Sequence, residues 1–405
     1  MKRTPGRPRL RSPESSPGDS RWGPGTVAVH AGDRPDRNAG AVVAPIYQTS
    51  TFRFPAAFSE AGARRTHLYT RVANPTLTQA GSVVSALEGG KEGRVFASGM
   101  AALSTVLLGH LNRGDEVLAP EDLYGNTVTL LKQELPRWGI AVRFVPAARG
   151  SQVGEYLSER TRLLLVESPT NPTLHVYDLR AWARAAERAH AWLVVDNTFS
   201  TPVNQQPLRW GAHVVMHSAT KYLGGHSDLL AGALVSGPGL LTGLDPFAAT
   251  LGGTLDPIAG FLLLRGMKTL PLRMARHNEN ARAVVEELEG HPKVMRICYP
   301  GRASAEEERI CRRQMRGRGG MVSLVLRGGL GGARRFLQGL SLFQVASSLG
   351  GVESLVSLPL ETSHRAMSSE ERERRGIADS MARLSLGIED AADLVADLKG
   401  ALSRV

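Results

Sequence analysis

His217-Ser-Ala-Thr-Lys-Tyr-Leu-Gly-Gly-His-Ser227 combines a lysine with neighbouring hydroxyl and glycine residues. It follows the apolar run 214–216, which is typical of a buried strand, and it delivers Lys221 to a glycine-rich loop. Lysine is rare in this chain, which has 7 lysines against 42 arginines. Arginine stays protonated, whereas a partly desolvated lysine loses its proton and bonds covalently to an aldehyde. Lys221 is therefore a candidate covalent site, the alternative being a surface lysine that happens to follow a strand.

A second apolar run, residues 191–195, ends in Asp196-Asn197-Thr198. Open α/β sheets collect functional groups at the carboxyl ends of their strands, so we expect Asp196 and Lys221 to face one crevice. An aspartate that pairs with a pyridine nitrogen keeps that nitrogen protonated and lets the ring accept electrons. On its own, an aspartate at a strand end is often only a helix cap or a turn former.

A candidate phosphate site lies in residues 94–108, which combine a strand-like start, a small-residue turn and a strong helical pattern. The backbone N–H groups of Gly99 and Met100, at the positive end of the helix dipole, favour an anion. Ser218 and Thr220 add hydroxyl donors beside the lysine. A Ser-Gly pair before a helix is by itself more often a plain cap. Together with the lysine and the aspartate, it predicts pyridoxal 5'-phosphate as the cofactor.

The order of the predicted elements indicates an α/β fold. Strand-like and helix-like stretches alternate between about residues 90 and 235, a pattern typical of a mostly parallel sheet with helices on both faces. A long helix is predicted over 269–290, followed by a smaller α+β domain with a helix over 306–318 and a strand over 321–326. We predict four segments: a disordered basic tail over 1–25, an N-terminal arm over 26–75, a cofactor domain over 76–268 and a C-terminal domain over 269–405.

The amino-acid composition indicates a cellular compartment and the kinds of partner to expect. Two cysteines, Cys298 and Cys311, are too few for a disulfide framework and favour the reducing cytoplasm. No apolar stretch approaches the ~18 residues that span a bilayer, so no membrane partner is expected. Residues 1–25 carry six basic and two acidic side chains among Pro, Gly and Ser, and lack hydrophobic periodicity. Such a tail is more often solvated than bound to nucleic acid, and no nucleic-acid partner is predicted.

Three histidines near the lysine, His213, His217 and His226, suggest a metal site. No carboxylate accompanies them at ligand spacing, and a cofactor explains the region better, so no metal is predicted.

The chain resembles, almost end to end, the pyridoxal-phosphate enzymes of cysteine and methionine metabolism. This family includes cystathionine γ-synthase, the cystathionine lyases, methionine γ-lyase and the homoserine-ester sulfhydrylases, and it has the fold of type I pyridoxal-phosphate transferases. The resemblance is carried by Thr26-Val-Ala-Val-His-Ala-Gly32, Pro45-Ile-Tyr-Gln-Thr-Ser-Thr-Phe52, Tyr69-Thr-Arg71-Val-Ala-Asn-Pro-Thr76, Glu167-Ser-Pro-Thr-Asn171-Pro, Ser218-Ala-Thr-Lys221-Tyr, Ser348-Leu-Gly-Gly-Val-Glu-Ser-Leu355 and Arg383-Leu-Ser-Leu-Gly-Ile-Glu389.

The resemblance implies a role for each matching residue. Lys221 looks like the Schiff-base lysine and the catalytic base, Asp196 like the partner of the ring nitrogen, and Tyr124 like the aromatic residue that stacks on the ring and assists catalysis. The implied phosphate ligands are Gly99, Met100, Ser218 and Thr220.

The resemblance also implies a substrate site and a shared active site. Asn171, Ser348 and Arg383 look like the residues that bind the carboxylate of a small amino-acid substrate, and a planar guanidinium suits that task because it donates two parallel hydrogen bonds. In the family, Tyr69 and Arg71 reach the cofactor phosphate of a neighbouring subunit. The resemblance therefore implies a homo-oligomer, at least a dimer and usually a tetramer.

For the reaction, we expect γ-elimination or γ-replacement on sulfur amino acids or activated homoserine esters, in the transsulfuration manner of cystathionine γ-lyase or γ-synthase. Methionine γ-lyases typically carry a cysteine two residues after the stacking tyrosine, where this chain has Asn126. Cystathionine γ-enzymes often have glutamate where this chain has Ser347. Cystathionine β-lyase, methionine γ-lyase and homoserine-ester sulfhydrylase remain alternatives on the same fold. A non-catalytic pyridoxal-phosphate-binding interaction protein is the alternative from another class.

Overall fold

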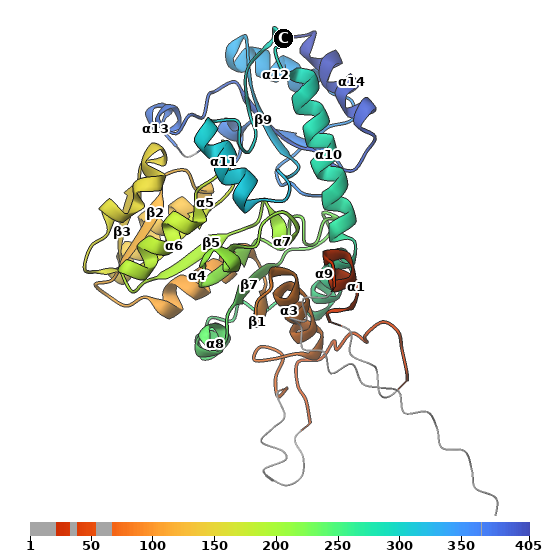
Figure 1. Cartoon of the computed structure of the whole chain (residues 1–405). Coiled ribbons are helices and arrows are strands. Elements are labelled where there is room, and N and C mark those ends of the chain that lie inside the picture. Colours follow the sequence, from red (N-terminus) through yellow and green to blue (C-terminus); the bar gives the residue numbers. More distant parts are fainter. Residues whose placement is uncertain (1–21, 33–38, 54–66, 366) are drawn as a thin grey trace, which may run out of the picture.

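A seven-stranded sheet forms the centre of the larger part of the structure (Figure 1). The computed structural model describes residues 22–32, 39–53, 67–365 and 367–405. The strands lie in the order β1-β7-β6-β5-β4-β2-β3; β7 runs antiparallel to both neighbours, whereas the pairs from β6 to β3 are parallel. Their bounds are β1 Glu92–Phe96, β2 Glu116–Pro120, β3 Ala141–Val145, β4 Thr161–Glu167, β5 Trp192–Asp196, β6 Val214–His217 and β7 Gly232–Ser236. The predicted mostly parallel α/β sheet is confirmed.

Helices cover both faces of this sheet, so its central strands are apolar on both sides. In β5, Leu193 and Val195 belong to one buried cluster with α3, α6 and α9, whereas Val194 belongs to a second cluster with α4, α5 and α8. The helices on the first face are α3 Pro75–Glu88, α6 Leu179–Arg188 and α9 Pro257–Lys268, and those on the second are α4 Gly99–His110, α5 Gly125–Thr129 and α8 Leu240–Leu251. Shorter helical segments are α7 Thr201–Asn204, Leu130–Glu134, Leu135–Trp138, Ala147–Tyr156, Pro207–Trp210 and Pro359–Glu361.

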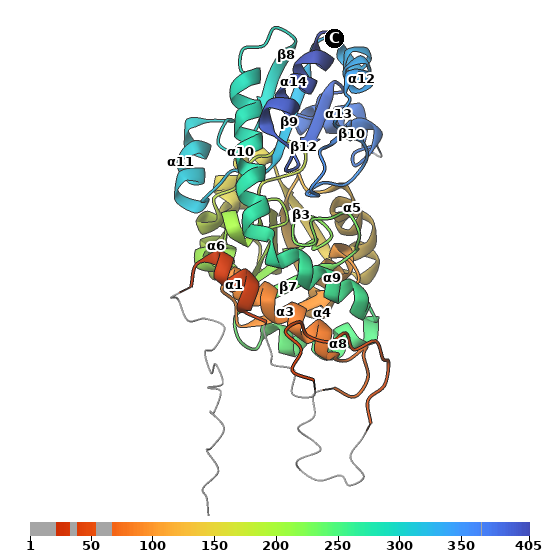
Figure 2. The same ribbon diagram turned by 90° about the vertical axis from the view of Figure 1, so that its right-hand side faces the viewer.

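The long helix α10, Leu270–Leu288, joins this part to a second sheet (Figure 2). Its first half packs Leu270 and Met274 into the core of the large sheet, and its second half packs Val284 and Leu288 into the core of the smaller one. The smaller sheet has the order β10-β11-β12-β9-β8, with strands β8 Val294–Cys298, β9 Met321–Leu326, β10 Gln344–Val345, β11 Leu355–Ser357 and β12 Met381–Ser385. Its helices are α11 Ala305–Gln314, α12 Gly329–Gly339, α13 Ser369–Arg374 and α14 Ala391–Leu402.

The predicted elements of this second part are largely confirmed. The strand over 321–326 has the predicted bounds, and the helix predicted over 269–290 is α10. The helix predicted over 306–318 was too long, because α11 ends at Gln314. Met315 is extended there, and the backbone N–H of Arg316 donates to the carbonyl of Asn204 at 2.7 Å. A contact with the first part of the chain therefore ends the helix, and local sequence does not encode it.

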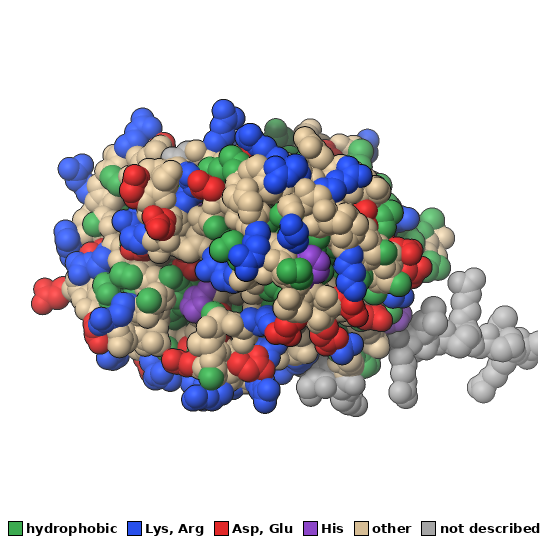
Figure 3. Space-filling view, turned by 90° about the horizontal axis from the view of Figure 1, so that it is seen from above, with side chains coloured by type: hydrophobic (Ala, Val, Ile, Leu, Met, Phe, Trp, Pro, Cys, Tyr) green, Lys and Arg blue, Asp and Glu red, His purple; other side chains and the backbone are tan. Residues whose placement is uncertain are grey.

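The N-terminal residues that the structure describes lie against the first part. Helix α1, Pro24–His30, contacts α3, α9 and α10 of its own chain, so the beginning of the predicted arm packs on the body of the protein. Most of the predicted tail, residues 1–21, lies outside the described residues. Among the helices described, none is long and apolar enough to cross a membrane. Seen from above, basic side chains are spread over the surface and interspersed with acidic ones (Figure 3).

Candidate functional site

One cavity of about 570 Å³ lies where the carboxyl ends of β4, β5 and β6 meet loops of the second part. Ten of the twelve residues predicted for the site line it, which confirms that the strand ends converge on one crevice. These ten are Gly99, Met100, Tyr124, Asn171, Asp196, Ser218, Thr220, Lys221, Ser348 and Arg383.

Lys221 lies on the turn that follows β6. Its Nζ donates a hydrogen bond to Ser348 Oγ at 2.7 Å. Burial, together with the positive charge of Arg383, lowers the pKa of Lys221 to about 8. A lysine with this pKa is partly neutral near physiological pH, so it has the lone pair that both covalent attachment and proton abstraction require.

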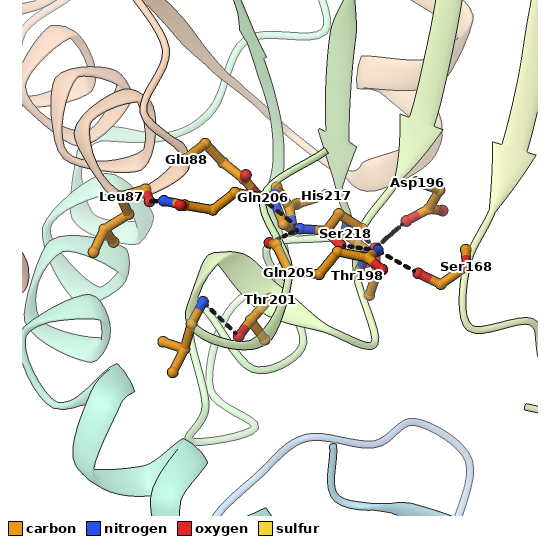
Figure 4. A network of polar contacts seen from close by, with 12 residues as sticks. Leu87, Glu88, Ser168, Asp196, Thr198, Thr201, Gln205, Gln206, His217 and Ser218 are labelled. Carbon is orange, nitrogen blue, oxygen red and sulfur yellow. Dashed lines mark hydrogen bonds and ion pairs between the residues drawn. The ribbon is translucent and has the colours of Figure 1, made fainter. Parts of the chain in front are cut away.

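Asp196 is the last residue of β5, and its carboxylate is held by the next turn (Figure 4). Asp196 Oδ1 accepts hydrogen bonds from the backbone N–H and the hydroxyl of Thr198, at 3.0 and 2.5 Å. The same Thr198 hydroxyl accepts a bond from the backbone N–H of Ser218 at 2.8 Å. Burial raises the pKa of Asp196, and the bonds from Thr198 oppose that rise. An oriented carboxylate at this depth suits a protonated ring nitrogen.

The N-terminus of α4 borders the cavity at the place where the sequence predicts an anion site. Ser98 caps the helix by accepting from the backbone N–H of Ala101 at 3.1 Å, while the N–H groups of Gly99 and Met100 belong to the first turn, which has no intrahelical acceptors. A Cβ at Gly99 would lie 2.9 Å from Ser218 Cβ, so only glycine allows the helix to approach this loop closely. The donor set and the close approach fit a phosphate group.

Thr220 lines the same cavity, but its hydroxyl is also engaged in the loop itself. Thr220 Oγ1 accepts from the backbone N–H of Ala231 at 2.9 Å. This bond ties the Lys221 loop to the start of β7, a contact that the sequence did not indicate.

Arg383 reaches the cavity from β12 of the second sheet. Its guanidinium donates to Asn171 Oδ1 at 3.0 Å and to the carbonyl of Ser348 at 3.1 Å. Arg383 is only 5% exposed, and burial lowers its pKa to about 10. Both acceptors are neutral oxygen atoms, so the charge of Arg383 remains available to an anionic substrate group.

Sequence reasoning missed Glu167, the last residue of β4, which also lines the cavity. Its Oε2 accepts from the backbone N–H of Tyr124 at 2.8 Å, and its Oε1 accepts from that of Asn171 at 2.9 Å. Burial, followed by the charge of Asp196, holds the pKa of Glu167 well above its usual value. The available signal was its place at the end of an apolar run, like that of Asp196, with which it pairs in register.

Tyr124 precedes α5 and faces the cavity. Burial raises the pKa of its phenol above the usual value. Asn126 donates from Nδ2 to the phenol oxygen at 3.2 Å. Asn126 and Ser347, which stand where the family resemblance implies a cysteine or a glutamate, both line the cavity.

Tyr69 and Arg71 are the two predicted site residues that lie elsewhere. They border a separate cavity of about 440 Å³ with residues of the arm and of the segment before α9. Arg71 donates to the carbonyl of Ala249 at 2.7 Å and lies over the Tyr69 ring, 5.5 Å from its centroid. Tyr69 is 43% exposed. Within one chain, these residues are therefore not part of the Lys221 cavity.

The three histidines near Lys221 have separate partners. His213 Nδ1 accepts from the backbone N–H of Leu193 at 3.0 Å, His226 Nδ1 lies 2.9 Å from the carbonyl of Gly224, and His217 Nε2 lies 2.6 Å from Glu88 Oε1. Among the residues that the structure describes, no group of three or more His, Cys, Asp or Glu side chains is arranged to hold a metal ion.

Comparisons with known proteins agree with this geometry. A cystathionine γ-synthase of Mycobacterium tuberculosis is 44% identical over 94% of this chain and 97% of its own length. An L-methionine γ-lyase of Pseudomonas putida is 42% identical over 93% of this chain and 96% of its own. A cystathionine γ-lyase of Bacillus subtilis is 42% identical over 94% of this chain and 99% of its own.

Solved structures are also similar to this chain. The crystal structure of a cystathionine γ-lyase from Lactobacillus plantarum complexed with L-serine has a TM-score of 0.89 and 35% identity, and the similarity covers 95% of this chain and 99% of that one. A cystathionine γ-synthase from Xanthomonas oryzae, in complex with aminoacrylate and cysteine, has a TM-score of 0.87 and 40% identity, over 95% and 98% of the two chains. The family model described as Cys/Met metabolism PLP-dependent enzyme matches residues 25–403. The chain therefore belongs to the PLP-dependent enzyme family of cysteine and methionine metabolism.

Proposed function

We propose that this enzyme catalyses elimination or replacement at the γ-carbon of a sulfur amino acid or an activated homoserine ester. The observation that carries the proposal is the convergence of Lys221 and Arg383 on Ser348, which accepts from Lys221 through its hydroxyl and from Arg383 through its carbonyl. Ser348 thereby holds the candidate base, Lys221, close to the candidate carboxylate-binding group, Arg383. The relatives named cystathionine γ-synthase, cystathionine γ-lyase and methionine γ-lyase support the choice of the γ-carbon.

Pyridoxal phosphate, when bound, supplies a ring that takes up the electron pair released as the substrate Cα–H bond breaks. Lys221 would hold it covalently, Asp196 would pair with its ring nitrogen, and Tyr124 would lie against its ring. Its phosphate would be held by Gly99, Met100, Ser218 and Thr220.

The residues of the chain would bind and orient the substrate and move its protons. Arg383 and Asn171 would bind the carboxylate, which leaves the substrate Cα–H within reach of Lys221 Nζ. Once the substrate amine has replaced it on the aldehyde, Lys221 would take the proton from Cα, give that proton up, and then take one from Cβ, so that the leaving group departs from Cγ with the electron pair of its bond. Tyr124 is the second proton-transfer group of the cavity and would assist at the leaving group.

We also propose that the enzyme is a homo-oligomer, at least a dimer and in its full form a tetramer. Tyr69 and Arg71 lie outside the Lys221 cavity of their own chain, which supports a role in a neighbouring subunit. Exposed apolar side chains of the segment 26–75 and of α9 support a subunit contact; they are Val42, Val43, Ile46, Leu68, Val72 and Ile258.

The location and the domain boundaries are proposals as well. The free thiols of Cys298 and Cys311 support the cytoplasm. For the domains, we propose 76–268 and 269–405, because α10 begins at Leu270 and passes from one core to the other.

The reaction is tested with the holoenzyme in two separate assays. The first assay contains L-cystathionine, and the second contains an O-acylhomoserine together with L-cysteine. γ-Cleavage in the first identifies a lyase, and cystathionine formed in the second identifies a synthase. The variant Lys221→Arg keeps a positive charge but cannot bond to the aldehyde, so it should abolish both reactions. Failure of both reactions in the wild type, while pyridoxal phosphate is bound, would leave cystathionine β-lyase, methionine γ-lyase, homoserine-ester sulfhydrylase and the non-catalytic protein as the alternatives.

A further inference from the structure

A buried acid and imidazole pair lies behind the wall of the Lys221 cavity, on the opposite face of the sheet. Asp196 and Thr198 line the cavity, and Asn197 lies between them in the chain. Likewise, Met216 and Ser218 line the cavity on either side of His217. Because successive residues of an extended chain point to opposite faces, Asn197 and His217 point away from the cavity.

Both side chains meet one carboxylate there. Glu88, at the end of α3, accepts at Oε1 from His217 Nε2 at 2.6 Å and from Asn197 Nδ2 at 2.8 Å. All three residues are fully buried. Figure 4 shows Glu88 and His217 beside the strand ends that carry Asp196 and Ser218. Glu88 therefore links Asn197, which follows Asp196, to His217, which precedes Ser218.

The cavity side of the same two strand ends is joined by Thr198. Its hydroxyl accepts from the backbone N–H of Ser218 and donates to Asp196 Oδ1. The ends of β5 and β6 are thus tied on both faces, by Thr198 in front and by Glu88 behind. The spacing between Asp196 and the Lys221 loop depends on these two ties.

The contact with Glu88 also fixes the position of the His217 ring. A buried carboxylate needs hydrogen-bond partners, and His217 Nε2 at 2.6 Å and Asn197 Nδ2 at 2.8 Å supply two of them to Glu88 Oε1. Burial raises the pKa of Asp196, whereas the bonds from Thr198 and the positive charge of His217 lower it. His217 thus favours the ionised carboxylate at the position where a protonated ring nitrogen needs it.

We propose that Glu88 and His217 are positioning residues for Asp196, which hold its carboxylate at a fixed distance from the Lys221 loop. The proposal rests on the proposed function, because it takes Asp196 as the partner of the ring nitrogen. Neither residue touches the cavity, so their effect on the reaction passes through Asp196.

The test uses three variants of the full-length holoenzyme. Glu88→Gln and His217→Gln keep side chains of similar reach and remove the charge. Gln206→Ala is the matched control, because Gln206 donates to the carbonyl of Leu87 at the same helix end, at 2.6 Å, without joining the Asp196 network. Each variant is examined for kcat, for KM and for the pH midpoint of the visible absorption band of the bound cofactor.

We expect Glu88→Gln and His217→Gln to lower kcat about tenfold, with KM changed less than about twofold, because substrate binding by Arg383 is not altered. The absorption midpoint should rise, since a ring nitrogen without its proton withdraws less electron density from the nitrogen of Lys221. Gln206→Ala should match the wild type in all three quantities.

The same titration with 1-deazapyridoxal phosphate, which has carbon in place of the ring nitrogen, isolates the route through Asp196. With this analogue, the midpoints of the wild type and of both variants should coincide. The proposal would be overturned if both variants had the midpoint of the control when pyridoxal phosphate is bound. It would also be overturned if their difference from the wild type persisted with the analogue, or if both variants failed to fold and bind cofactor. A wild type that binds no cofactor would instead overturn the proposed function.

Discussion

Lys221 follows β6 of the larger sheet and Ser348 precedes β11 of the smaller one, and a hydrogen bond of 2.7 Å from Lys221 Nζ to Ser348 Oγ joins them across the cavity. Ser348 has a φ of 87°, in the left-handed region that side chains other than glycine rarely adopt. The loop before β11 is thus held in a costly conformation at the point where it meets the lysine. This contact makes the second part of the chain a component of the site.

Ser348→Ala should lower kcat/KM about tenfold, the effect of losing one hydrogen bond to a charged group. Alanine retains the Cβ, so the cost of the backbone conformation is unchanged and the effect reports the hydroxyl alone. Steady-state kinetics with L-cystathionine measure it. Ser341→Ala, at an exposed serine whose backbone N–H donates to Asp397 Oδ1, serves as the control. Unaltered kinetics for Ser348→Ala would show that the bond does not orient Lys221.

The pKa of Lys221 predicts how cofactor capture depends on pH. Only the neutral amine attacks the aldehyde, and burial lowers this pKa to about 8. The rate at which the apoenzyme takes up pyridoxal phosphate should therefore rise about tenfold per pH unit below pH 8 and level off above it. Stopped-flow absorbance measures this rate. A rate that continues to rise to pH 10 would mean that Lys221 has its ordinary pKa.

Arg383→Lys should raise KM about 10- to 100-fold, because an ammonium group cannot form the two parallel hydrogen bonds of a guanidinium. Cofactor binding should be unchanged, since the phosphate and ring contacts come from other residues. Arg334→Lys, at an exposed arginine paired with Glu361 at 2.7 Å, is the control. If KM stayed constant while kcat fell, Arg383 would act on a proton-transfer step instead of on the carboxylate.

Arg71 and Lys221 should complement each other between subunits. If Arg71 serves the cavity of a neighbouring chain, Arg71→Ala and Lys221→Ala each inactivate every site of their own homodimer. Mixed after unfolding and refolding, they should recover about one quarter of the wild-type activity, because half of the dimers are hybrids with one intact site. No recovery on mixing, with hybrid dimers demonstrated by mass spectrometry, would place both residues in the same site.

The sequence was sufficient for features that short segments encode. Lys221 and Asp196 follow strongly apolar runs, and strands of a parallel sheet end at a common edge, so their convergence was predictable. The strand over 321–326 was predicted with its observed bounds because glycines flank a run that is apolar except for Ser323.

Features that depend on distant contacts were not predictable. The end of α11 is set by a bond from Arg316 to Asn204, more than a hundred residues away. Glu88 and His217 are 129 positions apart, and His217 by itself suggested only a metal ligand. In each case the partner is brought close by the sheet and its covering helices, and no local pattern identifies it.

The most direct test of the account is the identity of the keto acid that the cofactor-loaded enzyme releases from L-cystathionine, measured by mass spectrometry. Cleavage at the γ-carbon yields 2-oxobutanoate together with cysteine, and this is the result that we predict. Release of pyruvate with homocysteine would contradict the account, because it would show that the base and the carboxylate site described above direct cleavage at the β-carbon.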